Sequence, residues 1–195
     1  MKDDKQIWKD FKCGEEYSLS YIYQQNIDFL FYYGKKFSKN DDFILDSIQD
    51  LFYDLIRTRK SLGETSHIRM YLAKSLKRKL IRELEKKRME IELDSNRQFG
   101  PDIVFSVEED LVREESRTKN HQLIQRGMQE LSSKQREILY YRFHCGFDYE
   151  QICELMSISY DAARQLVSRA VLSLKEYLSD FGFVMLLIIS KLKKL

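Results

Sequence analysis

The sequence is poor in the residues that interrupt helices. Its 195 residues include one Pro and seven Gly, so long helices would meet few breakers. Hydrophobic residues make up 43% of the chain and charged residues 33%, a balance typical of a folded protein rather than a disordered one. We therefore expect an all-α protein with one large or two small domains.

Cysteines and long apolar runs are also scarce. Cys13, Cys145 and Cys153 are an odd number of cysteines and form no C-x-x-C motif, which indicates a reducing compartment and no disulfide framework. The first residues, MKDDKQIWKDF, are too polar for a signal peptide. The one apolar run, 181–189, has about half the length that spans a bilayer. We expect a cytoplasmic protein with no stable membrane insertion.

Motifs of common enzymes are absent. There is no P-loop, no Gly-rich dinucleotide loop, no G-x-S-x-G and no H-E-x-x-H. The candidate zinc ligands are His144, Cys145 and Cys153. A zinc site is disfavoured because their spacing fits no standard ligand set. Four carboxylates are spaced four residues apart, Asp42, Asp46, Asp50 and Asp54. A metal site is disfavoured there too, because no second acidic motif completes the ligand set. We expect no enzyme, no cofactor and no resident metal.

Charge is segregated along the chain, although the net charge is only +2. Residues 68–88 contain nine Lys or Arg and two Glu, a net +7, and residues 89–116 contain nine Asp or Glu and two Arg, a net −7. The acidic segment could fold back on the basic one or mimic nucleic acid within a partner's basic channel.

The periodicity of apolar residues divides the chain into two domains. We predict a first domain over 1–88, with helices over 5–37, 42–57 and 67–88 and a loop over 58–66. An acidic linker over 89–122 follows, irregular to about residue 105 and with a helix beginning near residue 106. A second domain covers 123–179, and an apolar and then basic tail covers 180–195. We expect the tail to pack on the second domain, although it could also bind a partner or a membrane surface.

Two helices of the first domain have contrasting polar faces. The helix over 42–57 is predicted to bury Ile44, Leu45, Ile48, Leu51, Phe52 and Leu55. Its exposed acidic stripe consists of Asp42, Asp46, Gln49, Asp50 and Tyr53. This stripe is either a solvated face or a docking surface for a basic partner. The helix over 67–88 exposes basic side chains, which suit DNA, a membrane surface or a calmodulin-type partner: Arg69, Lys74, Lys77, Arg78, Arg82, Lys86, Lys87 and Arg88.

The second domain carries the pattern of a helix-turn-helix. Ser132 and Gln135 have capping-box spacing, Asp148 can cap a short helix over 149–156, and Ser159 can cap the helix after it. That last helix places a small, apolar face opposite a polar face with Arg, Gln and Ser, as in a helix that reads the DNA major groove. Any small helical bundle with a polar surface is the alternative interpretation.

The two modules in this order resemble a sigma factor of bacterial RNA polymerase, a member of the sigma-70 family. The resemblance is to the small extracytoplasmic-function (ECF) type, especially the version common in Bacteroidetes, and covers about residues 5–179. The family pattern Asp-x-x-Gln-Glu-x-Phe corresponds to residues 46–52, DSIQDLF. Region 4 of the family corresponds to segments 131–138, 149–154 and 159–170.

The resemblance implies a region 2 helical bundle and a region 4 helix-turn-helix that bind core RNA polymerase and direct it to promoters. The residues that would dock on the polymerase β′ clamp are Asp46, Gln49, Asp50 and Tyr53. The residues that would bind melted −10 DNA are Arg59, Lys74, Lys77, Arg78 and Arg82. The residues that would read the −35 element are Tyr160, Asp161, Arg164, Gln165, Ser168 and Arg169.

Other parts of the chain acquire roles through the same resemblance. The loop over 58–66 corresponds to the family loop that captures a flipped −10 base, and the linker would enter the polymerase channels. The polymerase β flap and an anti-sigma factor are implied as further partners. The chain departs from the family at Arg78 and Arg82, where Asn and Asp are usual, and at Leu166, where many members have Arg.

Two other classes of protein stay open at this point. One is a stand-alone helix-turn-helix regulator that binds duplex DNA without polymerase, against which the docking motif at residues 46–52 argues. The other is an interaction protein, such as an anti-sigma mimic, that has lost promoter binding.

Overall fold

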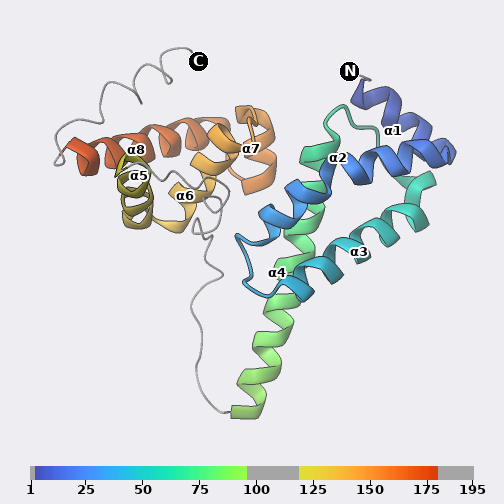
Figure 1. Ribbon diagram of the computed structural model, residues 1–195, viewed down its shortest axis with the longest axis horizontal. Coiled ribbons are helices and arrows are strands. Elements are labelled where there is room, and N and C mark those ends of the chain that lie inside the picture. The colour runs from blue at the N-terminus through green and yellow to red at the C-terminus, as the bar shows by residue number, and fades with distance from the viewer. Residues whose placement is uncertain (1–2, 96–118, 180–195) are drawn as a thin grey trace. The chain divides into compact units, whose positions relative to one another are not determined.

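The computed structural model describes residues 3–95 and 119–179, and every regular element within these ranges is helical. The chain forms two compact units that divide between Val104 and Phe105. Figure 1 shows α1 to α4 in the first unit and α5 to α8 in the second. The predicted all-α fold with two helical domains is confirmed.

Within residues 3–95, the first unit contains four α-helices and a short 3₁₀ turn. The helices are α1 (Asp4–Cys13), α2 (Glu16–Gly34), α3 (Asp41–Thr58) and α4 (Ile68–Ser95), and the turn, Arg59–Ser61, directly follows α3. Helices α2, α3 and α4 pack against one another, and α1 packs on α2. The last turns of α4 extend past the other three helices (Figure 1).

The prediction of one helix over 5–37 is wrong, because the chain breaks at Gly14. This residue has φ 97°, and its N–H group donates to the carbonyls of Asp10 and Phe11 at the end of α1. Glycine adopts this left-handed conformation without a steric penalty and is therefore common at helix ends. The long apolar pattern therefore covers two helices, α1 and α2, which pack on each other.

Helices α3 and α4 confirm two predicted helices and correct their details. Asn40 caps α3 by accepting a hydrogen bond from the Phe43 N–H at 3.0 Å. Leu45, predicted to be buried, is 47% exposed. Helix α4 continues to Ser95, so the prediction of irregular structure is wrong for residues 89–95, which are rich in good helix formers such as Met, Glu and Leu.

A row of leucines on α4 forms the centre of the first unit. Leu72, Leu76 and Leu80 are fully buried, as are Leu30 of α2 and Ile44 of α3. Helices α2 and α3 approach each other so closely at the end of α2 that a Cβ atom at Gly34 would lie 2.5 Å from Cγ2 of Ile44. The core therefore requires glycine at this position.

The described part of the second unit, residues 119–179, contains four α-helices and one π-helical segment. Helices α5 (Lys119–Glu130) and α6 (Ser133–Leu139) precede the π-helical segment Tyr140–His144, which is followed by α7 (Tyr149–Met156) and α8 (Tyr160–Ser179). The predicted capping box of Ser132 with Gln135 is present, and Asp148, the predicted cap of α7, forms a second capping box with Gln151. The predicted bounds of α7 are confirmed.

Helix α8 is the element on which the rest of the second unit packs. It contacts α5, α6 and α7, and its Ala170 joins Leu131 and Leu139 in a buried cluster. Gly127 of α5 allows a close approach, since a Cβ atom there would lie 2.7 Å from Cδ1 of Leu174.

No helix within residues 3–95 and 119–179 is long and apolar enough to cross a membrane. The predicted helix start near residue 106, most of the linker and the tail over 180–195 lie outside the described residues.

We predict that Gly34→Ala lowers the free energy of unfolding by about 1–3 kcal/mol, the usual cost of overpacking a core. The added methyl group would collide with Ile44. Urea denaturation measures this change. Gly63→Ala is the matched control because a Cβ atom there meets nothing within 4 Å, and an equal loss of stability in both variants would contradict the packing argument.

Candidate nucleic-acid and partner interfaces

The six residues predicted to read DNA on α8 share one exposed face. Residues Ala163, Val167 and Ala170 are buried on the opposite side, and Leu166 is half-buried. The exposed set is Tyr160, Asp161, Arg164, Gln165, Ser168 and Arg169. These side chains offer cationic groups, an amide and hydroxyls, which can bond to phosphates and to base edges.

The turn before α8 fixes the start of this face. Ser157 adopts a left-handed conformation with φ 55° and ends α7. The hydroxyl of Ser159 then accepts a hydrogen bond from the Ala162 N–H at 3.2 Å. The sequence therefore encodes the turn and the first residue of α8 through local hydrogen bonds.

A stack of side chains that the sequence did not reveal supports Tyr160. The Arg142 guanidinium lies 5.0 Å from the centre of the Tyr149 ring, and this ring lies 5.5 Å from that of Tyr160. Arg142 also donates to the Phe147 carbonyl at 3.1 Å. The stack joins the π-helical segment to α7 and to the first turn of α8, and it restrains Tyr160, which is 49% exposed.

The acidic stripe of α3 is exposed, as predicted. Asp46, Gln49, Asp50 and Tyr53 all lie on the surface. Leu45 and Ile56 are 47% and 43% exposed and lie on the same side of the helix. The stripe thus combines carboxylates with apolar side chains, a composition suited to docking against a basic and partly apolar helix.

Lys79 of α4 connects the acidic stripe to the core of the unit. Its ammonium group lies 3.0 Å from the Asp54 carboxylate and 3.6 Å from that of Asp50, and its side chain is only 13% exposed. The hydrogen bond from Lys79 holds the pKa of Asp54 below its ordinary value, and the charges of Lys79 and Arg57 act in the same direction. Asp50, although predicted to dock with a partner, is therefore also held by its own domain.

The basic residues predicted on α4 differ in their exposure. Arg78 and Arg82 are exposed, whereas Lys74 and Lys77 are half-buried. Arg82 forms an ion pair with its neighbour Glu83 at 3.2 Å. Arg78 and Arg82, the two departures from the family pattern, are thus the most accessible cations of the predicted −10 set on this helix.

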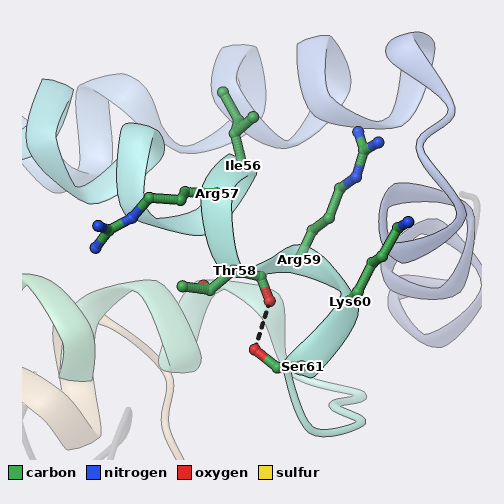
Figure 2. A pocket seen from close by; sticks show the side chains of 6 residues that line it. All are labelled: Ile56, Arg57, Thr58, Arg59, Lys60 and Ser61. Atoms are coloured by element: carbon green, nitrogen blue, oxygen red, sulfur yellow. Dashed lines mark hydrogen bonds between the residues drawn. The ribbon is translucent and has the colours of Figure 1, made fainter.

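Arg59, the fifth residue of that set, comes from a different element. It lines an open hollow of 380 Å³ together with Ile56, Arg57, Thr58, Lys60 and Ser61. Figure 2 shows Arg59 and Lys60 pointing to one side of this segment and Arg57 to the other. The Arg59 guanidinium lies against the end of α1, 3.2 Å from the position of a Cβ atom at Gly14.

Part of the chain matches a known protein family. Residues 121–174 match the model of "Sigma-70, region 4". This range contains α6, α7, the turn after α7 and most of α8, including the exposed face of α8 described above. A comparison of the sequence with curated proteins finds no match.

Solved structures resemble most of the chain. The sigma factor RpoE in complex with the anti-sigma factor NepR from Bartonella quintana has a TM-score of 0.58 and 20% identity, over 80% of this chain and 94% of that chain. CnrH in complex with the cytosolic domain of CnrY has a TM-score of 0.59 and 14% identity, over 91% and 97% of the two chains. The fold is therefore that of a two-domain sigma factor.

We predict that Lys79→Met lowers the free energy of unfolding at pH 7, because it removes the ion pair with Asp54. The loss should not exceed about 1 kcal/mol, since the Asp54 side chain is 44% exposed and solvent screens the pair. The ion pair lowers the pKa of Asp54, so its contribution is present above the ordinary carboxylate pKa and is lost as pH falls through the lowered pKa. Urea denaturation at a series of pH values should show the difference from wild type shrinking on acidification. Arg78→Met removes a charge from the preceding position of the same helix and should show no such trend.

Proposed function

We propose that the chain is a sigma factor of the ECF type that binds core RNA polymerase and directs it to specific promoters. The observation that carries this proposal is the exposed face of α8, within the residues that match sigma-70 region 4. The similarity to two sigma-factor folds supports it. Assignment to the version common in Bacteroidetes rests on the sequence resemblance alone.

In the proposed mechanism, α8 enters the major groove of the −35 element. Arg164 and Arg169 bond to phosphates or guanine edges, and Gln165 and Ser168 offer hydrogen bonds to neighbouring positions. The preceding helix, α7, crosses the DNA backbone, as in other helix-turn-helix proteins. Because Leu166 stands where many family members have Arg, the preferred −35 sequence should differ from theirs.

The first unit contributes polymerase docking and the capture of melted −10 DNA. The acidic stripe of α3 docks on the β′ clamp through Asp46, Gln49 and Tyr53, and region 4 binds the β flap. Arg78 and Arg82 hold the phosphate backbone of the separated strand. Binding energy drives DNA melting, since unstacked bases gain contacts on the protein that the duplex does not offer.

An anti-sigma factor is the regulatory partner that we propose. Both structures of similar fold contain such a regulator or a cytosolic partner domain, NepR with RpoE and a domain of CnrY with CnrH. A regulator of this kind would block the surfaces that polymerase needs, and its release would control transcription.

We predict that Arg164→Ala/Arg169→Ala reduces transcription at least about tenfold, because each lost base or phosphate contact costs about 1–3 kcal/mol. The measurement is run-off transcription with core polymerase from promoters upstream of the protein's own operon. Arg126→Ala/Lys134→Ala removes the same charge from exposed positions of α5 and α6, outside the helix-turn-helix, and should retain activity.

The transcription experiment also distinguishes the rival functions. Direct binding to duplex sites without core polymerase, and no transcript from any tested promoter, would favour a stand-alone regulator. Retained polymerase binding with no promoter footprint would favour an interaction protein.

We predict that Asp46→Ala/Gln49→Ala weakens binding to core polymerase about tenfold, as expected for residues at the centre of an interface. Titration of core polymerase with fluorescently labelled protein measures this affinity. The matched control is Gln24→Ala/Asp28→Ala, which changes the same residue types on the exposed face of α2. Equal weakening by both pairs would exclude α3 as the specific docking helix.

A further inference from the structure

Helix α1 presents a row of three polar groups to the segment between α3 and α4. Asp4, Trp8 and Lys12 are spaced four residues apart and therefore lie on one side of the helix. Each of them contacts residues 62–68, which are more than fifty positions away in the sequence. Helix α1 thus supports this segment through contacts along one side of the helix.

The three contacts fix three successive parts of the segment. The indole N–H of Trp8 donates to the Gly63 carbonyl at 2.8 Å. The Lys12 ammonium lies 2.5 Å from the Glu64 carboxylate. The Asp4 carboxylate accepts from the N–H of Ile68 at 2.9 Å, and so caps α4 from another helix.

The support itself is anchored in the core. Trp8 is fully buried, and its ring lies 5.4 Å from that of Phe11 and 4.8 Å from that of Tyr71, in the first turn of α4. An indole held in this way donates its hydrogen bond from a fixed position. The segment by contrast has no regular structure from residue 62 to 67 and exposes Gly63, Glu64, Ser66 and His67.

The ion pair also makes the segment less repulsive to nucleic acid. Glu64 is a carboxylate on a loop that, in the proposed function, approaches a polyanion. Lys12 neutralises this charge and draws it toward α1, and the hydrogen bond and charge of Lys12 lower the pKa of Glu64, with Lys5 and Lys9 acting in the same direction. Without Lys12, the carboxylate would be free to turn toward the DNA phosphates.

We propose that α1 holds residues 62–67 in the conformation that receives an unpaired −10 base, so that Asp4, Trp8 and Lys12 are positioning residues for promoter recognition. This inference rests on the proposed function. Its physical basis is preorganisation: a loop that is ordered before it binds loses less conformational entropy on binding. None of the three residues has to touch DNA for this effect.

The test uses the full chain bound to core polymerase and a pool of DNA bubbles whose −10 strand is randomised. Trp8→Phe keeps the ring in the core and removes only the donor to Gly63. Lys12→Met removes the ion pair, and Lys9→Met, an exposed position on the same helix, is the matched control. The measurements are the enrichment of the preferred bases and the hydrogen exchange of amides 62–67.

We expect amide exchange about fivefold faster and base enrichment about fivefold lower in Trp8→Phe and Lys12→Met, in proportion to one lost hydrogen bond. Lys9→Met should match wild type. The charge swap Lys12→Glu/Glu64→Lys should recover the enrichment that each single substitution loses, which a general loss of folding would not do.

Two results would overturn the inference, and only the second would also overturn the proposed function. Wild-type enrichment that persists in Trp8→Phe and Lys12→Met, despite faster amide exchange, would leave the proposed function intact and remove the role of α1. No enriched sequence with the wild-type holoenzyme would overturn the proposed function and this inference together.

Discussion

The first unit depends on the burial of one row of leucines along α4. Leu72, Leu76 and Leu80 lie one turn apart and are fully buried between α2 and α3. Once this row faces inward, the helical period turns Arg78 and Arg82 outward. The orientation of the basic surface is thus a consequence of the core, and any rotation of α4 that moved these cations would expose leucine.

In the second unit, small residues on the buried side of α8 determine which face of this helix is exposed. Ala163 and Ala170 on the buried side of α8 are fully enclosed, and Gly127 allows α5 to approach Leu174. These close contacts leave the opposite face of α8 exposed, with Arg164, Gln165 and Arg169 on it. A rigid helix with one polar face is the geometry that groove recognition requires.

Charge in the folded protein is distributed differently from charge along the sequence. Lys79 belongs to the basic segment, yet it is largely buried and is paired with Asp50 and Asp54 of the acidic stripe. Lys12 similarly neutralises Glu64. Exposed charges outside such pairs, among them Arg78 and Asp46, are therefore more relevant to partner binding than the net charge of either segment.

Features that arise within a few residues could be predicted from the sequence: the helix caps at Ser132 and Asp148, the bounds of α7, the start of α8 and the faces of α8. Local hydrogen bonds and helical periodicity produce these features, and both can be recognised along the chain. The exposure of Leu45, the pairing of Lys79 and the contacts of α1 with residues 62–68 could be found only in the folded structure. These depend on which helices lie side by side, and packing between distant segments brings together groups whose separation along the chain carries no signal.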